Sequence, residues 1–164
     1  LTICMYSESQ IKALNAIKRG TSIFLTGEGG SGKSFVINQI SSETNKSVAL
    51  TASTGIASLA INGLTIHSFL CLGIGEYTID YSVSKMSTKK KKGLRKLGIL
   101  VVDEISMINK GLFEKIDLVL QRIRSNEKPF GGIQIVAVGD LYQLPNISGE
   151  SIIKSQLFIC VFIT

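Results

Sequence analysis

Short apolar runs alternate with helical patterns along most of the chain. Four runs, rich in β-branched and other aliphatic side chains, lie at 22–26, 47–51, 97–102 and 134–138. Their length and nearly uniform hydrophobicity are typical of strands buried on both faces of a parallel sheet. Apolar residues at helical spacing separate the runs, most clearly over 111–124. The pattern predicts an α/β fold with a mostly parallel central sheet and helices on both faces.

The two ends and one internal stretch depart from this alternation. A helix is predicted after Ser7, which fits the N-cap of a capping box with Gln10, and Gly20 marks its end. Between Gly73 and Lys96 no periodicity is visible, and we interpret this stretch as a flexible, solvated insert. The apolar segment 157–163 is interpreted as a buried strand or as a sequence cut off within an element. It is much too short to cross a bilayer, so no membrane association is expected.

Composition adds a class of partner to this fold. The 164 residues are the length of one domain, and 18 basic against 12 acidic side chains give a net charge of +6, which favours a polyanionic partner. Seven basic side chains lie in the insert at 73–96. They are Lys85, Lys89, Lys90, Lys91, Lys92, Arg95 and Lys96. Such a tract is commonly a solvated surface, and contact with nucleic acid is the alternative.

Cysteine usage points to the compartment. The chain has three cysteines, Cys4, Cys71 and Cys160, and none is in a C-x-x-C pair. Neither a disulfide framework nor a zinc site is therefore predicted, and a reducing compartment is expected.

One glycine-rich segment matches a phosphate-binding loop. Residues 27–34 read Gly-Glu-Gly-Gly-Ser-Gly-Lys-Ser, which fits G-x-x-x-x-G-K-[ST] between a predicted strand and a predicted helix. Glycines let the backbone N–H groups of such a loop point inward, and the helix directs its positive end at the same place. The predicted triphosphate site comprises Gly27, Gly29, Gly30, Ser31, Gly32, Lys33 and Ser34. Lys33 is expected to reach the β- and γ-phosphates, and the Ser34 hydroxyl to bind Mg²⁺.

Polar residues follow two further predicted strands. Asp103 and Glu104 end the third apolar run, so in a parallel sheet they lie at the carboxyl edge beside the phosphates. Asp103 is predicted to hold Mg²⁺ and Glu104 to polarise the water that attacks an NTP; carboxylates that cap the next helix are the alternative. Gln143 follows the fourth run. It either senses a γ-phosphate or belongs to a surface turn closed by Pro145.

Taken together, these stretches resemble the Pif-type (petite integration frequency) DNA helicases of superfamily 1, relatives of the RecD-like helicases. The resemblance covers nearly the whole chain. It rests on Ser7–Gln10, on the loop 27–34, on Thr-Ala-Ser-Thr-Gly-Ile-Ala at 51–57 with Gly-Leu-Thr-Ile-His-Ser-Phe at 63–69, on Asp-Glu-Ile-Ser-Met at 103–107, and on Gly-Gly-Ile-Gln at 131–134 with Gly-Asp-Leu-Tyr-Gln-Leu-Pro at 139–145. The T-x-H-S-F, D-E-I-S-M and G-D-x-x-Q-L-P segments in this order are specific to that family.

The resemblance implies a role for several residues. Gln10 would read the adenine edge, although the capping box explains it equally well. Thr54, Gly55, His67 and Ser68 would contact single-stranded DNA; by itself, His67 would be taken for a packed histidine. The basic insert lies where the family carries a small strand-separating element.

The resemblance also implies what the whole chain does. Residues 1–164 would be the first RecA-like motor domain, a P-loop NTPase, of an ATP- and Mg²⁺-dependent DNA helicase that moves 5′ to 3′. Such helicases act in DNA repair, recombination or telomere maintenance, in the nucleus or mitochondrion of a eukaryote. The family's second motor domain, with the arginine that completes the ATP site, does not follow Pro145, so weak binding and poor hydrolysis of nucleotide are expected. The alternatives are a truncated, non-catalytic nucleotide- or DNA-binding remnant and a P-loop ATPase that is no helicase.

Overall fold

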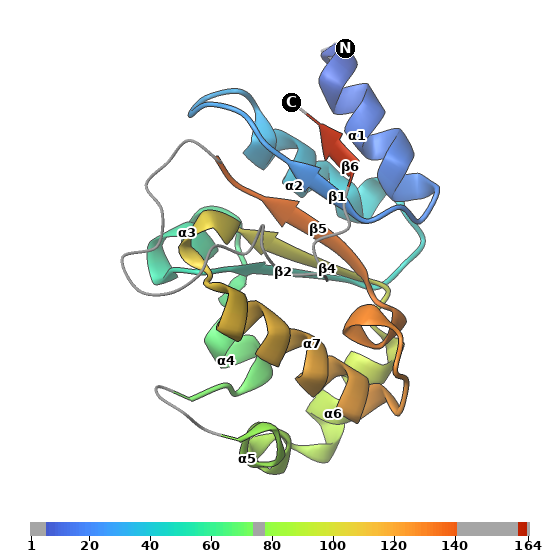
Figure 1. Ribbon diagram of the computed structural model, residues 1–164. Coiled ribbons are helices and arrows are strands. Elements are labelled where there is room, and N and C mark those ends of the chain that lie inside the picture. Colours follow the sequence, from blue (N-terminus) through green and yellow to red (C-terminus); the bar gives the residue numbers. More distant parts are fainter. Residues whose placement is uncertain (1–5, 74–77, 141–160, 164) are drawn as a thin grey trace.

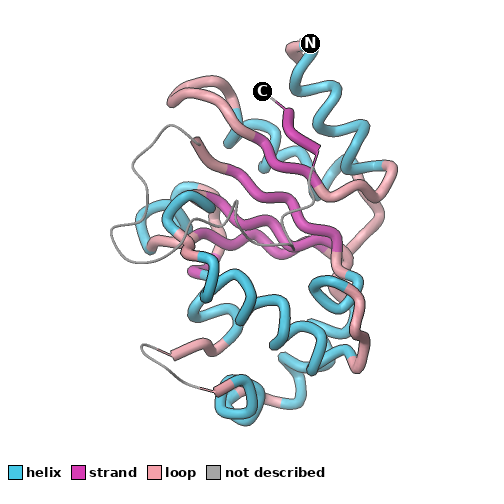
Figure 2. The backbone as a smooth tube through the Cα atoms, in the orientation of Figure 1, coloured by secondary structure: helices cyan, strands magenta, loops and turns pink. Residues whose placement is uncertain are grey.

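Six parallel strands form the centre of the molecule. The structure, a computed structural model, describes residues 6–73, 78–140 and 161–163. The strands are β1 (Ile23–Leu25), β2 (Val48–Ala52), β3 (Leu64–Thr65), β4 (Ile99–Asp103), β5 (Gln134–Val138) and β6 (Val161–Ile163). They form one sheet in the order β3-β2-β4-β5-β1-β6, and each neighbouring pair is parallel. The strands are drawn in magenta in Figure 2. The four predicted apolar runs are therefore confirmed as strands β1, β2, β4 and β5.

Helices cover both faces of this sheet. They are α1 (Glu8–Lys18), α2 (Lys33–Glu43), α3 (Gly55–Ala60), α4 (Ile66–Leu70), α5 (Ile79–Lys85), α6 (Thr88–Lys96) and α7 (Lys110–Arg124), with short 3₁₀ turns η1 (Ile105–Met107) and η2 (Pro129–Gly132). In Figure 1, α1 and α2 lie on one side of the sheet and α4, α6 and α7 on the other. The α/β fold predicted from the sequence, with helices on both faces, is confirmed.

Alternation along the strands divides the core into two parts. Leu100 and Val102 of β4 pack with α4, α6 and α7, whereas Ile99 and Val101 pack with α1 and α2. Successive side chains of a strand point to opposite faces, so a uniformly apolar strand supplies both cores. This is why the central strands show no polar alternation in the sequence.

The prediction of a flexible, irregular insert at 73–96 is wrong for its described part. Residues 78–96 contain α5 and α6, whose N-caps are the side chains of Thr78 and Ser87. Leu94 is the buried residue of α6, and the rest of that helix is mainly lysine. One buried side chain leaves no apolar stripe, so hydrophobic periodicity could not reveal the helix. The helix is instead fastened by Arg124, whose Nη1 donates to the carbonyls of Leu94 (3.0 Å) and Leu97 (3.0 Å).

The end of the chain supplies an edge strand. β6 lies parallel to β1 with Val161 opposite Ile23, which confirms a strand within the segment 157–163. The part of that segment before Val161 lies outside the described residues. Within the described ranges, no helix is long and apolar enough to span a membrane.

Candidate functional site

The glycine-rich loop connects β1 to α2, and Gly27 and Gly32 are needed there for steric reasons. Gly32 is the N-cap of α2 and has φ +87°, a left-handed conformation that favours glycine. A Cβ at Gly32 would lie 2.6 Å from Gln10 Nε2, and one at Gly27 would lie 2.8 Å from Ser31 Oγ. The loop therefore combines a left-handed backbone with close packing, and a side chain at Gly32 would displace Gln10.

Lys33 lies folded across the loop. It begins α2, and its Nζ donates to the carbonyl oxygens of Gly27 and Glu28, the latter at 2.8 Å, and lies 3.3 Å from Ser31 Oγ. An ammonium has three donors and no acceptor. The group is thus held at the loop by neutral oxygens, which an anion in the loop would outcompete as a partner because a charged acceptor bonds it more strongly.

The acidic pair lies at the end of β4. Burial raises the pKa of Asp103, and the charge of Glu104 raises it further; the hydrogen bond from the Glu104 N–H (2.9 Å to Oδ1) and the charge of Lys33 act in the opposite direction. Glu104 follows in a left-handed conformation with φ 53° and ψ 43°. The alternative that these carboxylates cap the next helix is wrong, since Asn109 caps α7 and the Glu104 side chain makes no capping bond.

One cavity brings the loop and the acidic pair together. Its volume is about 340 Å³. It is lined by Gly29, Gly30, Gly32, Lys33, Ser34, Asp103, Glu104, Gly139 and Asp140. Five of the predicted loop residues and both carboxylates therefore converge on one space, which is lined by a cation, a helix N-terminus and carboxylates, whereas the predicted Gly27 and Ser31 do not line it.

The donors in the cavity suit a hard cation. The Ser34 hydroxyl and the Asp103 carboxylate both line it, and such oxygens are the ligands that Mg²⁺ accepts beside phosphate and water. Among the described residues, no group of three or more His, Cys, Asp or Glu could hold a metal by itself. The set therefore fits a metal that arrives with a phosphate ligand.

Asp140 was not predicted as a site residue. It lies two residues beyond the end of β5, is 9% exposed and lines the cavity beside Gly139. Its place at the carboxyl end of a parallel strand was the available signal. Gln143, predicted from the same segment, lies outside the described residues.

The side chain of Gln10 contacts both the start of α1 and the glycine-rich loop. Its Oε1 accepts from the Ser7 N–H (2.9 Å) and the Gln10 N–H donates to Ser7 Oγ (3.2 Å), which confirms the predicted capping box. Its Nε2 lies against Gly32 of the loop. The capping box therefore holds this amide next to the glycine-rich loop, and the two interpretations of Gln10 are compatible.

A second group of predicted residues lies further along the same sheet edge. Thr54 caps α3, accepting from the Ala57 N–H (3.2 Å), and the exposed Gly55 begins that helix. His67 and Ser68 belong to α4, which follows β3. Ala52 of β2 pairs with Thr65 of β3, so Thr54 and His67 each lie two residues beyond the same register. The four residues are thus gathered at adjacent strand ends.

His67 favours its neutral form. Burial lowers its pKa, and the charge of Lys115 lowers it further. A basic side chain borders this helix, because Lys90 Nζ of α6 donates to the Ser68 carbonyl at 2.9 Å. The described surface next to Ser68 therefore carries positive charge, and His67 can act as a hydrogen-bonding group.

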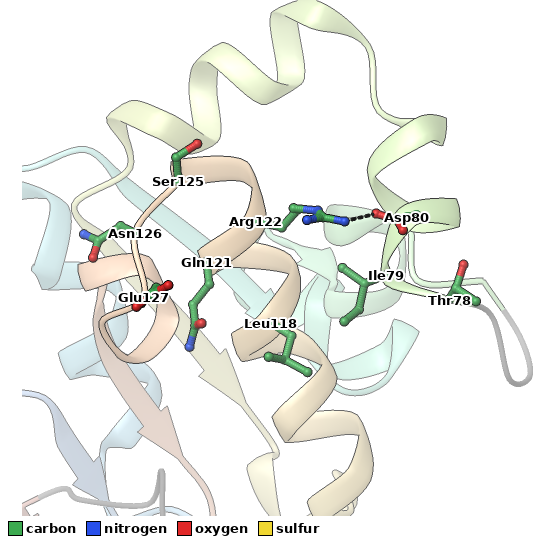
Figure 3. Close-up of a pocket in the computed structure, with 9 residues that line it drawn as sticks. All are labelled: Thr78, Ile79, Asp80, Leu118, Gln121, Arg122, Ser125, Asn126 and Glu127. Atoms are coloured by element: carbon green, nitrogen blue, oxygen red, sulfur yellow. Dashed lines mark hydrogen bonds and ion pairs between the residues drawn. The ribbon is translucent and has the colours of Figure 1, made fainter.

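The larger hollow of about 690 Å³ lies elsewhere, between α5 and α7 (Figure 3). Its lining includes Ile79, Leu118 and Gln121, and Arg122 points at Asp80, with which it forms a 2.6 Å ion pair. No residue predicted for nucleotide or DNA binding lines this hollow. Its size alone does not make it the functional site.

Comparisons with known proteins agree on one family. The model of the PIF1-like helicase family matches residues 5–161. The ATP-dependent DNA helicase RRM3 of Saccharomyces cerevisiae is 43% identical over 139 residues, which are 80% of this chain and 19% of the relative. The crystal structure of the Pif1 helicase from Candida albicans superimposes with a TM-score of 0.87 at 33% identity, covering 98% of this chain and 40% of that one.

A further solved relative was captured with ligands. It is the Pif1 helicase from Bacteroides in complex with ADP-AlF3 and single-stranded DNA, with a TM-score of 0.80 and 33% identity over 88% of this chain and 34% of that one. The chain thus spans well under half of the length of these relatives, 19% in the yeast case.

Proposed function

Because the chain belongs to the PIF1-like helicase family, we propose that it is the first RecA-like motor domain of an ATP-dependent DNA helicase. The observation that carries the proposal is the cavity in which the phosphate loop and the acidic pair converge. The yeast relative is an ATP-dependent DNA helicase, and the Pif1 helicase from Bacteroides was solved with ADP-AlF3 and single-stranded DNA. The RecA-like fold is shared with those solved structures.

The predicted site residues would have distinct tasks. The loop at 27–32 would surround the phosphates with N–H groups, and Lys33 would leave its carbonyl partners for the β- and γ-phosphates. Ser34 and Asp103 would hold Mg²⁺. Bound there, the metal would neutralise charge that develops on the phosphates during transfer. Glu104 would orient and polarise the attacking water, and Gln10 would contact the adenine.

Single-stranded DNA would cross the neighbouring strand ends. Thr54, Gly55, His67 and Ser68 lie together there, and backbone contacts to phosphates would make the affinity depend on salt. Since burial and Lys115 lower the pKa of His67 and so keep it neutral, it would contact the strand by hydrogen bonding. Gln143 as a sensor of the γ-phosphate is supported by its segment's resemblance alone.

The finer assignments are proposals based on resemblance. They are movement from 5′ to 3′, a second motor domain that completes the ATP cleft, and work in DNA repair, recombination or telomere maintenance in the nucleus or mitochondrion. A P-loop ATPase that is no helicase would leave the residues 54, 55, 67 and 68 without a ligand. A non-catalytic remnant would bind ligands and never turn over.

Ligand binding by substituted chains tests the proposal. The Kd of a fluorescent ATP analogue with Mg²⁺ is measured for wild type, Lys33→Ala and the control Lys12→Ala, an exposed lysine of α1. Loss of charge-assisted bonds should weaken the Lys33 variant by at least about tenfold and leave the control unchanged. Glu104→Gln should bind as wild type. Equal affinity of the Lys33 variant and wild type would refute the nucleotide site.

The DNA half is measured separately. Anisotropy of a labelled oligothymidylate gives its Kd for wild type, for His67→Ala and for the same Lys12 control. Weaker binding by the His67 variant alone would support the strand path. If wild type binds Mg²⁺·ATP and no oligonucleotide, the non-helicase ATPase is favoured instead.

A further inference from the structure

Several neighbours hold the peptide of Glu104 in an unfavourable conformation. Glu104 has φ 53°, a left-handed conformation that is unfavourable for residues other than glycine. Such a conformation is found only where the surrounding structure holds it. Its N–H bonds Asp103 Oδ1, and its carbonyl accepts from the Met107 N–H at 3.0 Å. These two bonds are local to the segment 103–107.

The third bond comes from another strand. The hydroxyl of Ser53 donates to the Glu104 carbonyl at 2.9 Å, and the Ser53 N–H donates to the Asp103 carbonyl at 3.1 Å. Ser53 therefore bonds the backbone of both carboxylate residues. Because β2 and β4 are neighbours in register, with Ala52 opposite Asp103, the contact closes the ends of the two strands.

Ser53 is also the residue before the DNA-contacting group. Thr54 follows it directly and caps α3, and Gly55 begins that helix. Ser53 and Thr54 share one planar peptide unit. A displacement of Thr54 and Gly55 by a bound strand is therefore passed on to Ser53, whose hydroxyl bonds the Glu104 carbonyl. No other residue separates the two groups along this route.

We propose that Ser53 is a positioning residue that couples strand binding at Thr54–Gly55 to the orientation of Glu104 in the nucleotide cavity. The inference rests on the proposed function. Ser53 lies within the segment 51–57 that carries the resemblance, but no role was predicted for it, since its partner Glu104 is 51 residues away in the chain. The bond is either formed or broken, so both ligands can bias it, and the influence must be reciprocal.

The experiment measures that reciprocity in this chain. The Kd of a labelled oligothymidylate is determined without nucleotide and with saturating Mg²⁺·ADP–aluminium fluoride, and the ratio of the two values is the coupling factor. Wild type should give a factor of about 5- to 150-fold. Ser53→Ala should bring it close to 1 while each ligand alone binds within about twofold of wild type.

A matched pair isolates the hydroxyl from the shape of the side chain. Threonine and valine have nearly the same shape and differ by that hydroxyl, so Ser53→Thr should keep the coupling and Ser53→Val should lose it. This pair decides the question if the alanine variant does not fold. Ser84→Ala is the control, because the Ser84 hydroxyl bonds the Tyr81 carbonyl within α5 and neither residue is assigned to a ligand site.

The outcomes separate the coupling from the function beneath it. A coupling factor that survives in both Ser53→Ala and Ser53→Val, or a wild type with no coupling, overturns the role of Ser53. If Ser53 is only structural, its replacement should lower thermal stability and leave the coupling factor unchanged. That result would also overturn the proposed role of Ser53. If wild type binds no nucleotide through Lys33, or no oligonucleotide, the proposed function itself has failed.

Discussion

Burial of Asp103, a predicted site residue, lowers the stability of the fold when its carboxylate is charged. Burial raises its pKa above the ordinary 3.8. Between that value and the raised one, the folded chain binds more protons than the unfolded chain, so stability falls as the pH rises through this window. At neutral pH the whole cost of burying the charge is present.

Asp103→Asn should therefore be more stable than wild type at pH 7. Asn can still accept from the Glu104 N–H, and each 1 kcal/mol gained would raise Tm by about 2–4 °C for a chain of this size. The gain should shrink as the pH falls toward 3.8, because protonation of Asp103 removes the buried charge from wild type. Thermal unfolding of both proteins from pH 4 to pH 8 measures this.

The same variant should lose its response to ligand. Without a carboxylate, Mg²⁺·ATP should raise Tm much less than in wild type, because stabilisation follows affinity.

Asp80→Asn is the control for the stability of Asp103→Asn: this exposed carboxylate pairs with Arg122, so its removal should lower stability slightly or leave it unchanged. An Asp103 variant less stable than wild type at pH 7 would contradict this expectation.

Single residues also show what the sequence could predict. Local spacing predicts the glycine-rich loop, the acidic pair and the capping box, because each is a short sequence pattern that can be recognised without the fold. Ser53 and Asp140 were missed. Their importance comes from partners in other strands, and no spacing rule reports which strand ends become neighbours.

At the scale of elements, Arg124 makes several hydrogen bonds that join α7 to the end of α6. Arg124 of α7 donates through Nη1 to the carbonyls of Leu94, Arg95 (2.8 Å) and Leu97, and through Nε to that of Gly131 (2.6 Å). Hydrogen bonds from a charged group contribute about 1.5–3 kcal/mol each and are not additive. Arg124→Ala should lower the free energy of unfolding by about 2–4 kcal/mol.

Arg122 on the same helix is the matched control. It is exposed and pairs with the exposed Asp80, so Arg122→Ala should cost no more than about 1 kcal/mol. Urea unfolding of the two variants beside wild type makes the comparison. Equal destabilisation would mean that the carbonyl contacts of Arg124 contribute nothing special.

The exposed lysines of α6 can be tested for contact with nucleic acid, the alternative to a solvated surface. Lys89 and Lys92 are exposed on it, next to Lys90, which contacts α4 at Ser68. If both lysines bind phosphates, changing them to Gln should lower the slope of log K against log [salt] for an oligonucleotide by about 0.7 for each phosphate that is no longer neutralised. Lys12→Gln with Lys128→Gln, also exposed, removes the same charge elsewhere. Equal slopes in both double variants would favour a solvated tract.

The elements that the sequence hid share a physical cause. β3 has two residues, and α6 buries one side chain, so neither carries a periodic apolar pattern. Both are held by tertiary contacts, β3 by its pairing with β2 and α6 by Arg124. The remaining signals were the caps Thr78 and Ser87, which a search based on hydrophobic periodicity passes over.

For the whole molecule, fold class was predictable because it depends on repetition. Four uniformly apolar runs separated by helices leave few arrangements other than a parallel sheet with both faces covered. The order of strands was not predicted, yet it places β1, β5 and β4 side by side and so assembles the cavity. Topology therefore converts three separate motifs into one site.

Turnover by the chain alone should be slow. No arginine is among the described residues that line the cavity, and the chain spans 19% of its yeast relative. In other NTPases, an arginine that reaches the transferred phosphate contributes about 10³- to 10⁵-fold in rate. We expect slow ATP hydrolysis, little stimulation by single-stranded DNA and no unwinding, although nucleotide binding depends on Lys33.

Phosphate release with and without oligothymidylate tests this, with Lys33→Ala and Glu104→Gln as inactive references. Turnover barely above both references would mean that the cavity is half of a cleft which a second motor domain completes. Vigorous, DNA-stimulated turnover that both substitutions abolish would mean the opposite, namely a complete site within this chain or between two copies of it. The dependence of specific activity on protein concentration would then separate these two cases, because a site shared between copies disappears on dilution.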